Sequence, residues 1–200
     1  MSNNILTQPT IYLASRSPRR VELLAQIGLH CKIAPADIDE TQLIDESPEA
    51  YVTRLAHEKA MACQQRLPVA ERSHPVLAAD TTVVLAGQVL GKPENDDDAR
   101  HMLQALSGSV HQVHTAVALA FADVIEVVLS TTRVEMMTLS TMQIDCYIAS
   151  GEHLDKAGSY GIQGLAGAWI KRIEGSYTGV MGLPIYETAV LLRKHQLIVL

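Results

Sequence analysis

Residues 15–20 carry the first side chains suited to chemistry, in a segment that reads Ser-Arg-Ser-Pro-Arg-Arg. The segment follows an apolar run at residues 11–14 that predicts a strand, and Ser17 before Pro18 predicts the first turn of a helix. A helix N-terminus presents free N–H groups, and arginine binds pairs of phosphate oxygens, so the segment is suited to hold an anion. A capped surface helix with solvated arginines fits the same spacing equally well.

Lys59 is the second candidate and lies on a helix that Ser47-Pro48 predicts to begin. It follows Leu55 and Ala56 by four and three residues, on the apolar stripe of that helix. A lysine directed at a core needs an anionic partner or a cleft. Snorkelling at the edge of the stripe is the alternative, and spacing alone favours it.

Asp80 is the third candidate, because it interrupts an apolar run at residues 76–85. A carboxylate in such a run is costly unless it is paired, hydrogen-bonded or bound to a metal. A carboxylate held in this way is suited to act as a general base on water. The alternative is a turn or bulge in which the aspartate caps its own backbone. The apolar surroundings favour the functional role.

Three further positions are less specific when each is taken alone. Lys92 in Gly-Lys-Pro could supply a second cation, and Glu40 could bind a hard metal ion through oxygen. Residues of either kind are most often solvated. Gln163 lies in a glycine-rich stretch at residues 158–167 and offers both a donor and an acceptor, as the reading of a base edge requires. A flexible surface loop is the alternative there, although apolar residues within the stretch argue against full solvation.

The elements that must position these residues alternate between strands and helices. Alternating apolar residues at 113–121 predict a strand with one buried face, and residues 83–90 predict a hairpin. The other predicted strands cover residues 11–14, 76–79, 124–129 and 169–173; helices are predicted after Ser17, Ser47, Asn95 and Pro184 and over residues 140–149. The fold class is therefore α/β or mixed α+β, with several antiparallel strand pairs.

Composition excludes several classes of function. The 200 residues are 48% hydrophobic, enough for a sizeable core, and 22 acidic against 16 basic residues give a formal charge of −6. An acidic chain without a basic run is poorly suited to bind duplex nucleic acid or an anionic membrane. The three cysteines form no CxxC pair or disulfide pattern, and the first residues lack the features of a signal peptide. We expect a cytoplasmic protein.

Taken together and in order, the motifs resemble those of the Maf family. The resemblance covers residues 11–192 and rests on many short pieces in the family's order. They are residues 13–20 (LASRSPRR), 58–60 (EKA), 79–81 (ADT), 92–93 (KP), 106–108 (LSG), 155–158 (DKAG), 160–164 (YGIQG), 173–177 (IEGSY) and 182–184 (GLP). The resemblance implies a two-lobed Maf/ITPase-like fold with a central mixed sheet and a nucleotide cleft, as a single domain over residues 1–200.

The resemblance also implies an activity, namely hydrolysis of a nucleoside triphosphate between its α and β phosphorus atoms with magnesium or manganese. Asp80 matches the proton acceptor, and Glu40 with Asp80 matches the metal site. The positions that match the triphosphate site are Ser15, Arg20, Lys59 and Lys92, and those that match the base-selecting positions are Arg19, Thr81 and Gln163. A homodimer is the family expectation.

Two branches of the family differ in substrate. Ser-Pro-Arg-Arg and Gly-Ile-Gln-Gly resemble the branch that cleaves dTTP and UTP, whereas a 7-methyl-GTP branch carries Trp at the position of Arg19 and an acid near that of Gln163. A purine-specific enzyme, or a nucleotide-binding regulator of cell division with little hydrolysis, are the alternatives. Asp80 beside three cations argues against the regulator. Met136 replaces a more usual aromatic residue, which we expect the core to accommodate.

Overall fold

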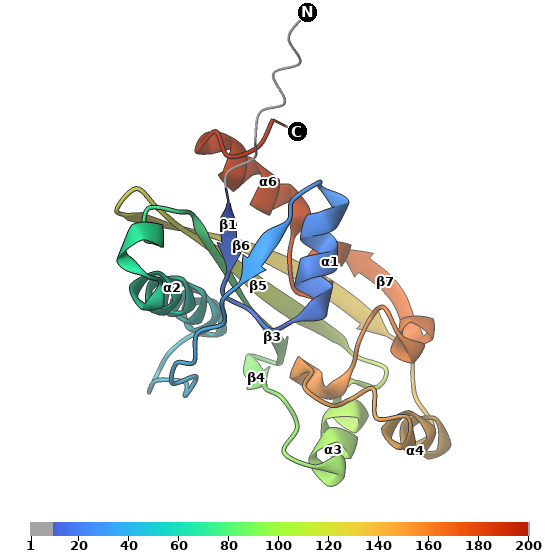
Figure 1. The fold of residues 1–200 in the computed structure, drawn as a ribbon. Coiled ribbons are helices and arrows are strands. Elements are labelled where there is room, and N and C mark those ends of the chain that lie inside the picture. Colours follow the sequence, from blue (N-terminus) through green and yellow to red (C-terminus); the bar gives the residue numbers. More distant parts are fainter. Residues whose placement is uncertain (1–9, 200) are drawn as a thin grey trace, which may run out of the picture.

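The computed structural model describes residues 10–199, which form a mixed α/β fold around one seven-stranded sheet. The strand order is β2-β1-β3-β5-β6-β7, and β4 pairs with β3 outside this path (Figure 1). β1 is parallel to β2 and β3, whereas the remaining pairs are antiparallel. The predicted fold class, with its antiparallel pairs, is confirmed.

The strands differ greatly in length. The three long ones form the middle of the sheet and carry most of its pairing: β3 (Val76–Leu85), β5 (Val110–Phe121) and β6 (Val124–Met136). The short ones lie at the edges or beside the site: β1 (Ile11–Leu13), β2 (Cys31–Ile33), β4 (Gln88–Leu90) and β7 (Ile170–Glu174).

Helices cover both faces of the sheet. α2 (Pro48–Arg66) crosses one face over β3 and β5, and α1 (Pro18–Gln26), α5 (Tyr177–Met181) and α6 (Ile185–Lys194) lie on the other (Figure 1). α3 (Asp96–Leu106) and α4 (Thr141–Ala149) pack together beyond the β4 end of the sheet. Three 3-10 turns complete the elements: η1 (Val69–Glu71), η2 (Ala157–Ser159) and η3 (Leu165–Trp169).

The sheet separates two apolar cores of different character. Beneath α2, alanines at positions 78, 116, 118 and 120 meet Val52, Ala56 and Ala60, and these small side chains let the helix lie close to the strands. On the opposite face, Leu77, Val117 and many other large apolar residues fill the space under α1, α5 and α6. Met136 belongs to this larger core and is 1% exposed. The core therefore accommodates this methionine, as the sequence analysis expected.

Two details of the strand predictions are wrong. β5 is buried on both faces from Val113 to Ala120, because the alanines that alternate with its large residues lie beneath α2. Residues 76–79 and 83–85 belong to one continuous strand, β3, that runs straight through Asp80, so the turn or bulge at that residue does not exist. Regular pairing with β5 continues across this position, so the backbone of Asp80 is held within the sheet.

The predicted helix starts agree with the structure. Ser47 and Asn95 accept backbone N–H groups at the starts of α2 and α3, whereas Ser17 occupies the cap position of α1 without a side-chain hydrogen bond. The sequence analysis did not predict β2 or α5, which are only three and five residues long. Short elements give too little periodicity to be distinguished from loops.

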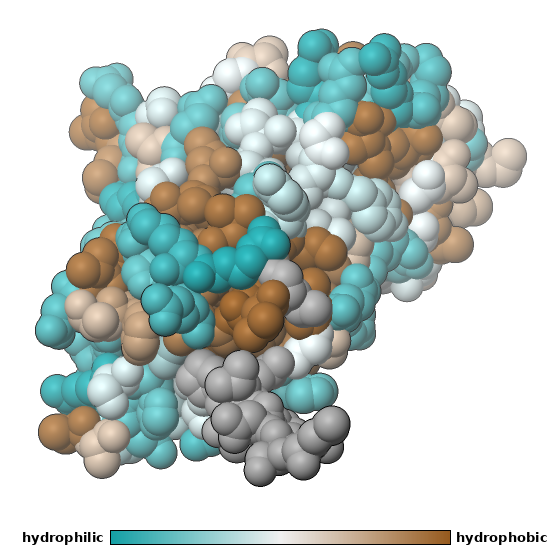
Figure 2. All heavy atoms as spheres, turned by 90° about the horizontal axis from the view of Figure 1, so that it is seen from above, coloured by the Kyte–Doolittle hydropathy of each residue, from teal (hydrophilic) through white to brown (hydrophobic). Residues whose placement is uncertain are grey.

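No helix within residues 10–199 is long and apolar enough to cross a membrane. The N-terminal segment that bears on the expected cytoplasmic location lies outside the described residues. The face seen from the α6 side shows apolar side chains in patches separated by polar ones (Figure 2). Exposed apolar residues of α6 include Tyr186 and Val190.

Candidate active site

One cleft of about 780 Å³ gathers every candidate site residue that the sequence analysis named. Its walls come from the loop between β1 and α1, the loop after β2, α2, β3, the turn after β4, the glycine-rich loop and the end of α5. The predicted site residues that line it are Ser15, Arg19, Arg20, Glu40, Lys59, Asp80, Thr81, Lys92 and Gln163. The structure therefore brings together side chains that are spread over most of the sequence.

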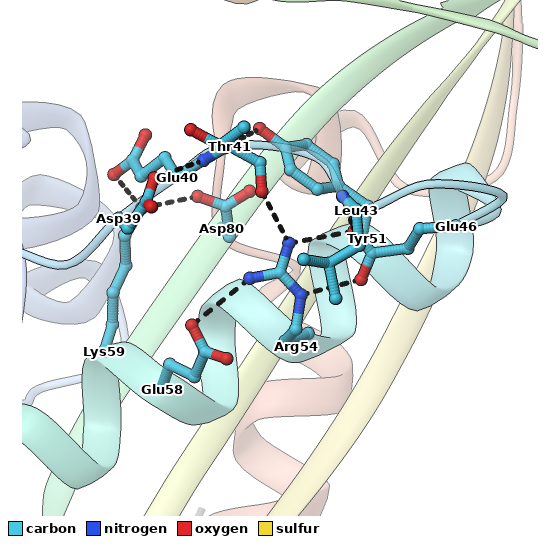
Figure 3. A network of polar contacts seen from close by, with 10 residues as sticks. All are labelled: Asp39, Glu40, Thr41, Leu43, Glu46, Tyr51, Arg54, Glu58, Lys59 and Asp80. Carbon is cyan, nitrogen blue, oxygen red and sulfur yellow. Dashed lines mark hydrogen bonds and ion pairs between the residues drawn. The ribbon is translucent and has the colours of Figure 1, made fainter.

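Lys59 lies at the centre of the charged groups. Its Nζ is 2.6 Å from Asp80 Oδ1 and 2.6 Å from Glu40 Oε1 (Figure 3). The alternation of β3 directs Asp80 to the face that α2 covers, and the apolar stripe of α2 directs Lys59 to the same place. The snorkelling alternative for Lys59 is wrong, because its side chain is 12% exposed and has anionic partners.

The loop that carries Glu40 is held by the first turns of α2, which the sequence analysis did not foresee. Tyr51 donates its hydroxyl to the carbonyl of Glu40 at 2.8 Å, and Arg54 donates to the carbonyl of Thr41 at 3.0 Å (Figure 3). Arg54 also binds both carboxylate oxygens of Glu46, at 2.7 and 2.8 Å. This fork-to-fork pair fastens the far end of the loop to the helix.

Charge within the cleft changes the titration of Glu40. Burial raises the pKa of its carboxyl, but Lys59, with Lys92 and Arg20 farther away, outweighs burial and lowers it below the ordinary value. Glu40 is therefore held as a carboxylate. Lys92 is exposed at the rim of the cleft, just after β4, where its charge still acts on Glu40.

Arg20 forms the opposite wall, on the α1 face of the sheet. Its Nε donates to the carbonyl of Gly182 at 2.8 Å, Nη1 donates to Ser15 Oγ at 3.0 Å, and Nη2 donates to Thr81 Oγ1 at 3.3 Å. Burial lowers the pKa of Arg20, though a guanidinium remains charged at neutral pH. Arginine has five N–H groups, so two remain for a bound anion after these three bonds.

The glycine-rich loop packs tightly on β3 and presents Gln163 to the cleft. Gly158 has a positive φ of 66°, and a Cβ there would lie 2.9 Å from a methyl group of Val83, so only glycine fits. Gly161 donates its N–H to the Tyr147 hydroxyl at 3.1 Å, which ties the loop to α4. Gln163 itself is exposed and lines the cleft.

Arg19 lies beside this loop, and its Nε donates to the carbonyl of Met181 at 3.4 Å. Glu152 accepts the N–H of Leu165 at 3.0 Å and also lines the cleft, as does Lys156. The sequence analysis missed Glu152, because an isolated acid in a loop carries no spacing signal; Lys156 lies in the motif at residues 155–158, but no role was assigned to it. Burial and the charge of Arg19 lower the pKa of Lys156. Arg19 and Lys156 therefore place two positive charges near each other at this end of the cleft.

The carboxylates of Glu40 and Asp80 suit a divalent cation. Their oxygens converge on one ammonium nitrogen, and magnesium in nucleotide sites is commonly bound by one or two carboxylates together with phosphate oxygens and water. Residues 10–199 contain no cluster of three or more His, Cys, Asp or Glu side chains placed to hold a metal. A two-carboxylate site that phosphate completes needs no such cluster.

Comparison with known proteins decides the family. Residues 10–195 match the sequence profile described as Maf-like protein. This chain belongs to the Maf family. The dTTP/UTP pyrophosphatase of Methylobacillus flagellatus is 60% identical to it over 92% of this chain and 91% of that protein. The dTTP/UTP pyrophosphatase of Chromobacterium violaceum is 54% identical over 91% and 92% of the two chains.

A more distant likeness is to a solved structure, the Ham1 protein of Staphylococcus aureus. It aligns with a TM-score of 0.47 at 17% identity, over 64% of this chain and 71% of that chain. This similarity is too distant to bear on activity. The Maf assignment rests on the family profile and on the close relatives, and it agrees with the resemblance that the motifs carry.

Proposed function

We propose that this protein hydrolyses dTTP and UTP to the monophosphate and pyrophosphate. The observation that carries the proposal is the Asp80 carboxylate, held 2.6 Å from Lys59 in a cleft that Arg20 and Lys92 also line. The names and the 47–60% identity of the relatives support the same substrates.

The cations of the cleft bind the triphosphate. A nucleoside triphosphate carries about four negative charges, and phosphoryl transfer depends mainly on positioning and charge neutralisation. Arg20 donates through its two remaining N–H groups, with Ser15 beside it, while Lys59 and Lys92 approach from the other wall. The protein as a whole has a formal charge of −6, so the attraction for a polyanion comes from this local cluster of cations.

Asp80 takes the proton in the chemical step. A water molecule held by its carboxylate attacks the α-phosphorus, the new P–O bond forms as the bond to the bridging oxygen breaks, and pyrophosphate leaves with that oxygen. The proton of the water passes to Asp80. Lys59 holds the carboxylate in place until then, because it donates to Oδ1 at 2.6 Å.

Glu40 and Asp80 are the residues that would hold magnesium or manganese. Such an ion, when bound, neutralises charge on phosphate oxygens and makes a bound water more acidic. Tyr51 and Arg54 fix the loop of Glu40, so the distance between the two carboxylates is set before any ligand arrives. Base selection falls to Arg19, Thr81 and Gln163, which line the cleft with both donors and acceptors.

A substrate panel tests the proposal. Pyrophosphate release is measured for dTTP, UTP, CTP, dATP, GTP and 7-methyl-GTP, each with magnesium or manganese. We expect dTTP and UTP to exceed every purine by at least about a hundredfold in kcat/KM, the range that hydrogen-bonded pockets reach. A preference for any purine, or release from no triphosphate at all, contradicts the proposal.

A further inference from the structure

The loop that carries Gln163 is held at two points, one on each side of that residue. Two residues before it, Gly161 donates its N–H to the hydroxyl of Tyr147 on α4 at 3.1 Å. Two residues after it, the N–H of Leu165 lies 3.0 and 3.3 Å from the two carboxylate oxygens of Glu152, in the turn that follows α4. Both attachments therefore come from one end of one helix, and they bracket the residue that is proposed to read the base.

The carboxylate of Glu152 has a rigid support. The backbone N–H of Glu152 donates to Ser150 Oγ at 3.2 Å, and the Ser150 hydroxyl donates to the carbonyl of Tyr147 at 2.6 Å. Leu165 is the first residue of η3, so its N–H has no partner within that turn. The backbone around Leu165 therefore depends on this one side chain for its hydrogen bond.

Gly164 makes room for the carboxylate. A Cβ at this position would lie 2.1 Å from Glu152 Oε2, closer than the nearest atom at any other glycine of the chain. Its φ of −99° is open to residues with a side chain, so the reason for glycine here is the approach of the carboxylate. Gly164 also donates its N–H to the carbonyl of Gly161 at 3.1 Å, which closes the turn that contains Gln163. The carboxylate thus lies directly against this turn.

Gln163 depends on these neighbours for its place in the cleft. Within residues 10–199 it takes part in no hydrogen bond or ion pair of its own. A side chain that must be ordered when a ligand arrives costs affinity, whereas one that is already held does not. Whatever fixes the backbone on both sides of Gln163 therefore strengthens the contacts that Gln163 makes.

We propose that Glu152 is a positioning residue that fixes the loop around Gln163 and thereby strengthens binding of the base. The inference rests on the proposed function, since it assumes that Gln163 contacts a nucleotide base. Glu152 acts through its hydrogen bond to Leu165 rather than through its charge, and it makes no contact with the substrate.

Three variants separate the bond from the charge. Glu152→Leu removes both, whereas Glu152→Gln removes the charge but keeps a side-chain carbonyl that accepts the N–H of Leu165. Gly164→Ala keeps the charge, and its methyl group displaces the carboxylate from Leu165. Glu174→Leu is the control, because the carboxylate of Glu174 belongs to β7, forms exposed ion pairs and lies outside the cleft.

Calorimetry measures the binding of two ligands to each variant. One is UTP with a methylene group between the α and β phosphorus atoms, a non-hydrolysable analogue, and the other is inorganic tripolyphosphate, which has no base. Hydrogen exchange of the Leu165 amide, followed by nuclear magnetic resonance, reports the bond itself.

The comparisons are made between proteins of equal charge. Affinity for the analogue should be about tenfold lower in Glu152→Leu than in Glu152→Gln, the effect of one hydrogen bond to the loop. It should be lower by a similar factor in Gly164→Ala than in the unmodified protein, and unchanged in Glu174→Leu. Tripolyphosphate should bind equally well within each pair. The amide of Leu165 should exchange faster in Glu152→Leu and Gly164→Ala alone.

Three results overturn the inference: equal affinity of Glu152→Leu and Glu152→Gln for the analogue, an equal loss for tripolyphosphate, or unchanged exchange at Leu165. Pyrophosphate release from UTP is measured on the same preparations. Any of these results with release retained removes the role of Glu152 and leaves the proposed function intact. Absence of release from the unmodified protein removes the proposed function, and the inference with it.

Discussion

At the scale of the residue, partners decide what each ionisable side chain can do. Lys59 is one ammonium between two carboxylates, and this places a formal excess of one negative charge at the point where a metal ion is proposed to bind. Arg16 shows the contrast, since its pair with Asp37 is exposed on both sides and such surface pairs contribute ~0–1 kcal/mol. The pair of Lys59 with Asp80 is by contrast largely buried, with side chains that are 12% and 11% exposed.

His111 illustrates how burial of a single residue affects stability. It is 1% exposed, and burial lowers the pKa of its imidazole from 6.5 to about 4. Above pH ~6.5 both the folded and the unfolded chain hold it neutral, so it has no effect on the pH dependence there. As the pH falls towards 4, the unfolded chain takes up a proton that the folded chain does not, and folding weakens by up to about 3 kcal/mol.

The prediction is that His111→Gln loses less stability on acidification than the unmodified protein. Urea denaturation at pH 7.5 and pH 4.5 measures the difference in the free energy of unfolding. His101→Gln, at an exposed site on α3, is the control and should leave the loss unchanged. Burial also lowers the pKa of His114, so part of the loss remains in every variant. An identical loss in His111→Gln would refute this account of the histidine.

At the scale of the element, the loop after β2 depends on α2. Arg54 joins the loop through Glu46 and the carbonyl of Thr41, and it reaches Glu58 on its own helix at 3.3 Å. The Glu46 side chain is only 8% exposed, and Arg54 lowers its pKa to about 2. Glu40 lies between this anchor and β2, so its position depends on residues that never touch substrate.

Arg54→Met should therefore impair the proposed metal site without replacing any residue that lines the cleft. We expect the manganese concentration for half-maximal binding, measured by electron paramagnetic resonance, to rise about tenfold, as loss of a supporting contact behind a metal ligand typically causes. Arg133→Met is the control, because Arg133 forms an exposed pair with Glu174 at 3.5 Å and lies outside the cleft. Unchanged manganese binding in Arg54→Met would show that the loop needs no anchor.

Much of the element pattern could be predicted from sequence, and the exceptions have physical reasons. Caps at Ser47 and Asn95 have local signals, and the predicted hairpin at residues 83–90 exists as β3 and β4. The second buried face of β5 could not be predicted, because alanine is small enough to be buried without a strong apolar signal. Tyr51 and Arg54 gave no signal at all, since their partners lie in an irregular loop.

At the scale of the whole molecule, the sheet divides the site into two walls. Asp80 and Lys59 lie on the α2 face, and Thr81 and Arg20 lie on the α1 face, so adjacent residues of β3 serve opposite sides. This division explains why the motifs are scattered along the sequence. The candidate residues could be named from sequence, but their convergence depends on strand order and register, which spacing does not reveal.

The most direct test of the account is Asp80→Asn, which keeps the shape of the side chain and removes its basicity. Turnover of UTP and binding of its non-hydrolysable analogue are measured together, with Asp97→Asn, an exposed position on α3, as the control. The account predicts that kcat falls at least about a thousandfold, within the range for loss of a general base, while analogue binding changes only a few-fold. Turnover that persists per bound substrate in Asp80→Asn would contradict the central role of this carboxylate.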